Sequence, residues 1–520
     1  MDTVTEPCTG LCQQNDSSEN TVRSVTSRAE AGESAGPARP APRRTRRAVL
    51  TAVGTVLALS GAVGTAAAVP TAPDTRAARN AAPADSVWRM DGYGLFVTVS
   101  GGVLRTWDTT ALSCLPGLTA TRQGAPGPGG EVRFGSPEAV LIVRQRGTDR
   151  ATLAVDGGVG TRDMRRVPAL PELCGRAPAT GPLANFDVFW QTFEENYAFF
   201  AARGVDWDAV RAKYRSKVTA RTTPAELFDI LAEMTAPLQD GHVALEADTP
   251  ELTRSARVGR EGTVEPSLEY DERVREFIER RDFGGVPLES HANGAIGYGE
   301  LPGGIGYLRI NRFTWYTPGA PVYQADAAEL TKVLDRIVTR ARTSGPGAWR
   351  GLIVDIRVNA GGMDELGLSI ASRLTDRSYQ AYAKQARNDP RDETRFTRRQ
   401  TIGVVPAAGV PRYTGPVALL TGGSTVSAGE TFAQALSERP STLRIGANTQ
   451  GIFSDVLGRS LPNGWKFSLS NERYTNPRGR SFEGPGIAPH VRTPVFTEKE
   501  FAAGRDSAFD RARALLNARS

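Results

Sequence analysis

The sequence has few of the residues that usually hold metals, and it lacks the charge pattern of a nucleic-acid-binding protein. Its 520 residues include four cysteines and three histidines, His242, His291 and His490. No His, Cys or Asp cluster has the spacing of a metal site, so we expect no metal and no organic cofactor. The net charge is +6, and no basic run interleaved with aromatic residues appears after residue 50. We therefore expect no nucleic-acid partner.

The N-terminal segment has the order of an export signal. A run of arginines at 43–47 precedes an apolar stretch at 48–63 and small residues that end at Ala68. That order predicts a signal over residues 1–68, cleaved after Ala68, and the paired arginines resemble a twin-arginine signal. A general secretory signal and a single membrane anchor are the alternatives. We expect an extracellular protein with no stable membrane association after cleavage.

Cleavage would leave only Cys114 and Cys174 in the chain. Two cysteines in one small domain outside the cytoplasm favour a disulfide between them. The alternative is a pair of buried free thiols.

The sequence predicts a multidomain protein. An Ala- and Pro-rich linker spans 69–84, and a small all-β domain, a sandwich or a barrel, spans 85–178. Its short β-like runs are separated by Gly, Pro and Asp, and lie at 94–99, 103–107, 131–134, 139–143 and 151–155.

Residues 180–248 read as a helical domain. Aromatic residues between 186 and 200 recur at spacings of three and four, which predicts one buried helical face. Thr223 and Glu226 form the pattern of a capping box that opens another helix. Residues 249–295 are polar and predict an irregular connector, and residues 501–520 predict a C-terminal helix.

Strands and helices alternate over 296–500, which implies an α/β domain with a largely parallel sheet. We expect strands at 306–311, 351–357, 416–421 and 443–445. We expect helices at 323–343, 363–374 and 428–438.

Ser427 stands where an apolar strand passes through a Gly-rich turn into a helix. A serine at this place can act as a nucleophile, because the first amides of the helix, beginning with Ala428, can stabilise an oxyanion. The alternative is a serine that only caps the helix. A second loop ends in Gly361 and Gly362, whose backbone amides could approach a substrate carbonyl and complete an oxyanion hole with Ala428.

Four segments resemble the ordered motifs of the tail-specific (C-terminal processing) serine peptidase family. They lie at 304–310, 355–362, 425–430 and 483–489, and the resemblance covers residues 180–500. It implies an α/β crotonase-like core, peptide or protein substrates, and Ser427 as the nucleophile.

The same resemblance suggests which residue is the base. One branch of the family uses a Lys about 25 residues after the Ser, where this chain has Ile452, so a Ser–Lys dyad would need Lys466. The tricorn-like branch uses a His and a late Glu, which His242 and Glu483 match. The tricorn protease carries a Ser just before that His, where this chain has Gly241.

This difference leaves open whether His242 meets Glu483 directly or through another residue, such as Asp240. A capped structural histidine is the alternative for His242. His490 and His291 match no catalytic position of the family.

Residues 249–295 are too few for the PDZ domain that many relatives carry. The sequence is therefore most similar to the branch without PDZ, which contains the tricorn-like and interphotoreceptor retinoid-binding proteins. We expect a secreted serine endopeptidase that works through an acyl-enzyme. A non-catalytic ligand-binding protein on the same fold and a serine esterase are the alternatives.

Overall fold

The computed structural model describes residues 85–319 and 322–518. The predicted export signal over 1–68 and the linker over 69–84 lie outside these residues. None of the helices in the described ranges is both long enough and apolar enough to cross a membrane.

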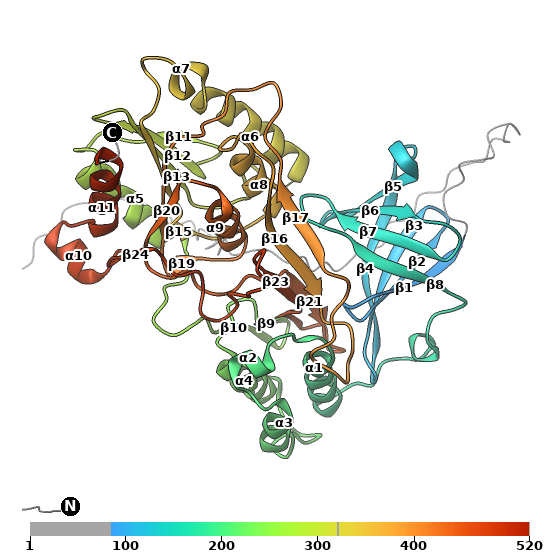
Figure 1. Cartoon of the computed structure of the whole chain (residues 1–520). Coiled ribbons are helices and arrows are strands. Elements are labelled where there is room, and N and C mark those ends of the chain that lie inside the picture. The colour runs from blue at the N-terminus through green and yellow to red at the C-terminus, as the bar shows by residue number, and fades with distance from the viewer. Residues whose placement is uncertain (1–84, 320–321, 519–520) are drawn as a thin grey trace, which may run out of the picture. The chain divides into compact units, whose positions relative to one another are not determined.

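The first domain is a closed eight-stranded barrel (Figure 1). Neighbouring strands are antiparallel, and β1 closes the barrel by pairing with both β2 and β8. Alternate side chains such as Trp88, Leu104 and Phe134 point into its core, as a half-buried strand requires. The strands are β1 (Ser86–Met90), β2 (Leu95–Ser100), β3 (Val103–Thr109), β4 (Cys114–Gln123), β5 (Glu131–Gly135), β6 (Val140–Gln145), β7 (Arg150–Val155) and β8 (Arg162–Val167).

Five of these strands, β2, β3, β5, β6 and β7, were expected from the sequence, and three were missed. In β8 only Met164 is buried among charged residues, and β4 contains Pro116 and Gly117, so neither has a strong strand pattern. The predicted disulfide is confirmed, because Cys114 and Cys174 are joined with an S–S distance of 2.02 Å.

A helical segment follows the barrel. The predicted aromatic face is buried, with Phe186, Phe193 and Tyr197 all fully enclosed. The predicted capping box is also confirmed, because Thr223 and Glu226 bond each other's backbone amides at the start of α4. The helices are α1 (Pro182–Asn196), α2 (Phe200–Arg203), α3 (Trp207–Arg215) and α4 (Pro224–Thr235), and a 3₁₀ turn, η3 (Ala236–Leu238), leads to His242.

A four-stranded sheet joins this segment to the C-terminal half of the chain. Its order is β10-β9-β22-β21, so β9, just after His242, pairs with β22, which lies more than 200 residues later. The strands are β9 (Ala244–Thr249), β10 (Leu252–Arg257), β21 (Val456–Ser460) and β22 (Lys466–Ser470).

The prediction of an irregular connector over 249–295 is wrong. This stretch contains β10, the helix α5 (Leu268–Asp282) and the short strand β11 (Glu289–His291). The helix was missed because its apolar face is narrow: Val274, Phe277 and Ile278 are its buried residues among many charged ones.

The core is a seven-stranded sheet of order β11-β12-β13-β14-β18-β20-β24. From β13 to β24 the neighbours are parallel, whereas β11, β12 and β13 are antiparallel, so the sheet is mixed. The strands not yet given are β12 (Ile296–Leu301), β13 (Ile305–Ile310), β14 (Gly351–Asp355), β18 (Val417–Thr421), β20 (Thr442–Gly446) and β24 (Val491–Arg492).

Helices cover both faces of this sheet (Figure 1). The α6, α8 and α9 helices pack their apolar residues on one face, and α5 and α11 pack theirs on the other. The bounds are α6 (Tyr323–Ile337), α7 (Arg340–Thr343), α8 (Asp364–Ser372), α9 (Ala428–Glu438), α10 (Glu498–Ala503) and α11 (Ser507–Asn517). The single helix expected over 323–343 is divided at Val338, after which Thr339 caps α7.

Two smaller sheets complete the core. The β16 strand (Tyr379–Ala386) pairs with β17 (Gln400–Val404) and β23 (Glu472–Thr475), and β15 (Val358–Asn359) pairs with β19 (Ser424–Thr425). The parallel β15–β19 pair lies between the two glycine-containing loops and holds them side by side.

Candidate active site

Ser427 occupies the N-cap position of α9, but its hydroxyl does not cap the helix. Its backbone has φ 54° and ψ −124°, a conformation that costs a non-glycine residue energy and that is concentrated at functional sites. Its side chain is partly exposed. The alternative of a structural capping serine is therefore not what the geometry shows, and the hydroxyl is left available.

The loop that contains Gly361 and Gly362 lies against Ser427. A Cβ atom placed on Gly361 would stand 2.6 Å from Ser427 Cβ and 3.2 Å from the amide nitrogen of Ala428. The two glycines have φ of 76° and 132°. Only glycine allows this approach, because any side chain at Gly361 would collide with the serine.

The three predicted oxyanion-hole residues differ in whether their backbone amides already make a hydrogen bond. Gly361 cannot donate its amide to a substrate, because that N–H is bound to Asn359 Oδ1 at 2.9 Å. Its inclusion as a donor is therefore corrected. Among the hydrogen bonds of the described residues, none is donated by the amides of Gly362 or Ala428. Ala428 directly follows Ser427, and Gly362 directly follows Gly361, whose Cβ position lies 2.6 Å from Ser427 Cβ.

His242 is buried at the start of the sheet that crosses between the halves of the chain. Its side chain is 9% exposed, and Nδ1 has no hydrogen-bond partner. Its backbone N–H donates to Asp240 at 2.9 Å, and its carbonyl accepts from Ser468 Oγ at 2.7 Å. The backbone of His242 is thus firmly held, while one ring nitrogen keeps its hydrogen-bonding capacity unused.

Burial lowers the pKa of His242 below its usual value. The charge of Arg257 acts in the same direction, whereas Asp240, Asp455 and a hydrogen bond to the backbone of Ser454 oppose it. A lowered pKa keeps the imidazole neutral near neutral pH, which is the form that accepts a proton.

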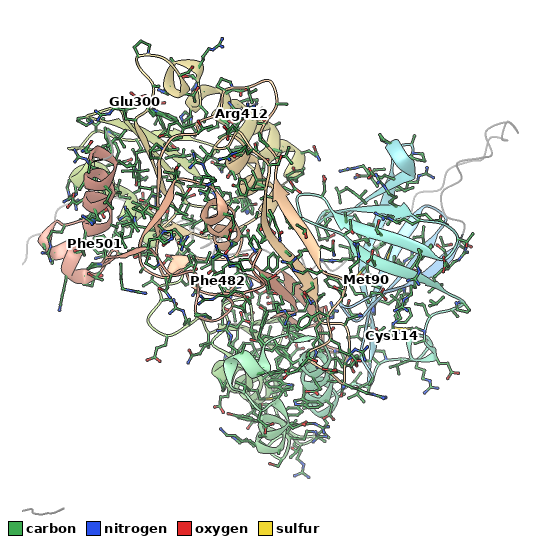
Figure 2. All side chains as sticks on the ribbon, viewed as in Figure 1. Met90, Cys114, Glu300, Arg412, Phe482 and Phe501 are labelled. Atoms are coloured by element: carbon green, nitrogen blue, oxygen red, sulfur yellow. A yellow bond between two sulfur atoms is a disulfide. The ribbon has the colours of Figure 1, made fainter. Side chains whose placement is uncertain are left out.

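Glu483 does not bind His242 in this structure. One carboxylate oxygen accepts from the amides of Phe453 and Ser454 at 2.9 and 3.2 Å, and the other accepts from Arg203 at 3.2 Å. Gly241 has no hydroxyl that could bridge to the histidine. The sequence left open whether Glu483 meets His242 directly, and in the structure the contact passes through the backbone of Ser454. Phe482, labelled in Figure 2, marks the loop that brings Glu483 to this segment.

The segment 451–454 is held by two buried carboxylates. Glu430, on the first turn of α9, accepts from the amides of Gly451 and Ile452 at 2.7 Å each. Glu483 takes the next two amides along the chain. The carbonyl of Ile452 in turn accepts from the amide of Ser427 at 3.2 Å. The loop that stands in place of the Lys motif thus fixes the backbone of the nucleophile.

The remaining candidate base is bound to a side chain outside the candidate site. Lys466 lies in β22, and its Nζ donates to Ser460 Oγ at 2.9 Å on the neighbouring strand. The side chains of Ser427 and His242 make no hydrogen bond to each other in the described part of the chain. The loops of Ser427 and His242 nevertheless both lie against Ile452. A Cβ atom placed on Gly241, next to His242, would stand 3.0 Å from Ile452 Cδ1.

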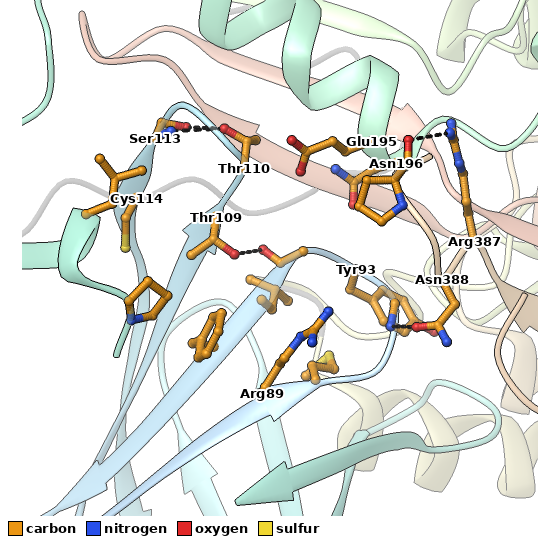
Figure 3. A pocket seen from close by; sticks show the side chains of 18 residues that line it. Arg89, Tyr93, Thr109, Thr110, Ser113, Cys114, Glu195, Asn196, Arg387 and Asn388 are labelled. Carbon is orange, nitrogen blue, oxygen red and sulfur yellow. Dashed lines mark hydrogen bonds between the residues drawn. The ribbon is translucent and has the colours of Figure 1, made fainter. Parts of the chain in front are cut away.

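A cavity of about 260 Å³ lies elsewhere, between the barrel and the end of α1 (Figure 3). Its lining includes Arg89, Tyr93, Glu195 and Arg387, and none of the predicted catalytic residues. In the described ranges no group of three or more His, Cys, Asp or Glu side chains could hold a metal ion.

Sequence reasoning missed Arg203 and the role of Glu430. Glu430 could have been found, because it belongs to the motif at 425–430. Arg203 lies in a short helix and belongs to no motif, so the sequence offered no signal for it.

Parts of the chain are similar to known peptidases. Residues 304–493 match peptidase family S41, and residues 178–236 match the tricorn protease C1 domain. Carboxy-terminal processing protease CtpA of Bacillus subtilis (strain 168) is 24% identical over 191 residues, which are 37% of this chain. The match spans only 35% of that relative's length.

A solved structure from Parabacteroides merdae ATCC 43184, described as a peptidase, has a TM-score of 0.53 and 25% identity. The similarity covers 65% of this chain and 97% of that one.

Proposed function

Because the chain belongs to the tail-specific and tricorn-type serine peptidases of family S41, we propose that it hydrolyses peptide bonds with Ser427 as the nucleophile. One observation carries this proposal. Ser427 occupies the N-cap position of α9 in a strained backbone conformation with a hydroxyl that makes no capping bond, Ala428 follows it with an unbonded amide, and the Gly361 loop packs against it. A capping serine would need neither the strain nor the glycine contact.

The proposed reaction has two steps. Ser427 Oγ attacks the substrate carbonyl carbon while His242 takes the hydroxyl proton, and the amides of Gly362 and Ala428 bind the oxyanion. His242 then gives the proton to the leaving amine, and an acyl-enzyme remains. Water attacks the acyl group with His242 again as the base, which releases the carboxyl product and restores Ser427.

Closure of His242 onto Ser427 is part of the proposal. Apo enzymes often hold catalytic hydrogen bonds long, and these bonds tighten when substrate binds. The ring has one hydrogen bond to the Ser454 backbone and one nitrogen, Nδ1, without a partner. That combination orients an imidazole and leaves it able to accept a proton.

Glu483 acts on His242 through the backbone in this proposal. Its carboxylate fixes the amides of Phe453 and Ser454, and the backbone of Ser454 holds the ring. Lys466 has no part, because its ammonium is bound to Ser460.

We also propose that the protein is exported and acts on peptides or proteins outside the cytoplasm. The predicted signal over 1–68 supports export, and the Cys114–Cys174 disulfide fits an oxidising compartment.

The test is labelling with a fluorophosphonate, which reacts with activated serines, combined with digestion of a diverse peptide library. The mature protein should take one label, on Ser427, and should cleave peptides. Ser427→Ala should lose both properties while keeping its fold, and peptide hydrolysis should fall by about 10⁶-fold. A wild type that takes no label and cleaves nothing would favour the ligand-binding alternative. Faster turnover of esters than of peptides would favour the esterase.

A further inference from the structure

Arg203 connects three segments that are far apart in the sequence. It is the last residue of α2, and its side chain is 7% exposed. One end of the guanidinium, Nη1, donates to the carbonyl of Gln239 at 3.2 Å. The other end, Nη2, donates to the carbonyl of Gly451 at 3.3 Å and to Glu483 Oε1 at 3.2 Å. Each acceptor belongs to a different loop of the candidate site.

The same guanidinium lies near two buried carboxylates. Asp240 Oδ2 is 4.0 Å from Nη2, the nitrogen that also bonds Glu483. Tyr197 donates its hydroxyl to Asp240 Oδ2 at 3.0 Å. Burial raises the pKa of Glu483 well above its usual value, and Asp240 raises it further, whereas Arg203 lowers it. Arg203 is therefore the cation that offsets the charge of the two buried acids, Asp240 and Glu483.

Each residue that Arg203 contacts is linked to a group of the proposed mechanism. Gln239 and Asp240 immediately precede the turn that carries His242, and Asp240 holds the amide of His242. Glu483 holds Phe453 and Ser454, and Gly451 is followed by Ile452, which accepts from the amide of Ser427. A shift of the guanidinium would change the position of His242 relative to Ser427.

We propose that Arg203 is a positioning residue, which fixes the His242 loop and the Glu483 loop against the segment that binds the backbone of Ser427. This inference rests on the proposed peptidase function. Arg203 reaches the reacting atoms only through these loops, so it should affect catalysis without contacting the substrate.

Arginine suits this place for a geometric reason. The planar fork presents five N–H donors in a fixed geometry, so it can bond acceptors on several segments at fixed angles. A lysine keeps the charge but donates from a single atom on a flexible stem, so it would serve fewer of these acceptors. A methionine removes the charge and leaves two buried carboxylates unpaired, which is costly.

The first experiment compares Arg203→Lys with a matched control, Arg215→Lys. Arg215 lies in α3 of the same helical segment and pairs with Asp187 at 2.8 Å, but its side chain is 36% exposed. We expect Arg203→Lys to lower kcat by about 10- to 100-fold, because small displacements of catalytic groups have effects of that size. KM should stay near the wild-type value. Arg215→Lys should match the wild type in both constants.

A second measurement does not depend on turnover. The chain has only three histidines, so proton NMR of the inactive Ser427→Ala protein should give three imidazole titrations. His242 should titrate below its usual value because of burial. Adding Arg203→Met should loosen the His242 loop, admit water and move that pKa up toward 6.5. His291 and His490 should not change.

These results separate the two hypotheses. If the wild type neither cleaves peptides nor takes the fluorophosphonate label, the proposed function fails, and the histidine titration still decides whether Arg203 positions the His242 loop. If the titration of His242 is the same with and without Arg203→Met, the inference about Arg203 is overturned. Wild-type kcat in Arg203→Lys would overturn it as well.

Discussion

Asp506 binds Nη1 of Arg357 through both carboxylate oxygens, at 2.6 and 2.7 Å. Asp506 also caps α11 by accepting from the amide of Phe509 at 2.9 Å. On its other side Arg357 binds Asp355, and all three side chains are buried. The end of the chain is thereby fastened to the strand that leads into the Gly361 loop.

Loss of Arg357 should therefore destabilise the fold strongly. Arg357→Met would leave two buried carboxylates without their cation, and we expect the free energy of unfolding to fall by about 3–5 kcal/mol. Chemical denaturation measures this change. Arg273→Met is the control, because Arg273 pairs with Glu498 of α10 at 2.8 Å, but both side chains are largely exposed and the loss should be much smaller. Equal losses in the two variants would contradict the argument.

Gly361→Ala should impair catalysis more than folding. The added Cβ would approach Ser427 Cβ to 2.6 Å, so the serine must shift. We expect kcat to fall by about 100-fold or more, since misplaced catalytic groups lose that much. Gly409→Ala is the matched control: its φ of 71° is close to the 76° of Gly361, and nothing lies within 4 Å of its added Cβ. If both variants keep wild-type kcat, the contact between Gly361 and Ser427 does not contribute to catalysis.

The pH profile should identify the base. Burial lowers the pKa of His242, so kcat/KM should fall on acidification through an apparent pKa below about 6.5. The sign follows because only the neutral imidazole accepts a proton. His242→Ala should be nearly as damaging as Ser427→Ala, since the two act as one unit. Lys466→Ala should change the rate little. The reverse ranking, with activity rising into alkaline pH, would point to Lys466.

Glu430 should make the fold less stable as pH rises. Burial raises its pKa to about 7, although Thr449, the amides of Ile452 and Gly451, and Arg260 oppose this. The folded state holds the proton more tightly than the unfolded chain, so this contribution is full below about pH 4.3 and is lost as pH rises through about 7.

The free energy of unfolding should decline between pH 5 and 8, and Glu430→Gln should remove roughly 3 kcal/mol of that decline. Denaturation at several pH values measures the slope, which is informative even if the variant is less stable at every pH. Glu272→Gln, at an exposed position of α5, should keep the wild-type slope. An unchanged slope in Glu430→Gln would show that Glu430 does not titrate in this range.

The barrel should depend on its disulfide. The bond closes a loop with a sequence separation of 60, and loops of this size gain about 4 kcal/mol from cross-linking. The double variant Cys114→Ser, Cys174→Ser should lose stability by about that amount in denaturation experiments. Intact-mass analysis of the mature protein should show no thiol that alkylates without a reductant. Two modified thiols would contradict the bond.

The sequence allowed the strands and turns around Ser427 to be predicted, because they depend on strong local patterns. β14 and β18 are buried along their whole length, and such strands are continuous apolar runs. The glycines and Ser427 follow these runs directly. Local order along the chain was enough to place them.

The contacts of Glu483 and Arg203 depend instead on segments that are distant in sequence. Arg203 binds residues 36, 248 and 280 positions away. Periodicity and spacing give no signal for such contacts. The pairing of Glu483 with His242 therefore came from the family resemblance alone, which left open whether the two meet directly. The narrow apolar face of α5 was missed for a different reason, since its charged residues hide three buried ones.

His242 is held by β22, a strand that is synthesised much later in the chain. The carbonyl of His242 is bound by Ser468, which is synthesised 226 residues later, and β9 finds its partner in β22 only then. A nascent or truncated chain that ends before β21 therefore contains His242 but lacks both β22, which holds it, and Glu483. Such a chain would hold His242 without the contacts of β22, so we expect it to have no peptidase activity.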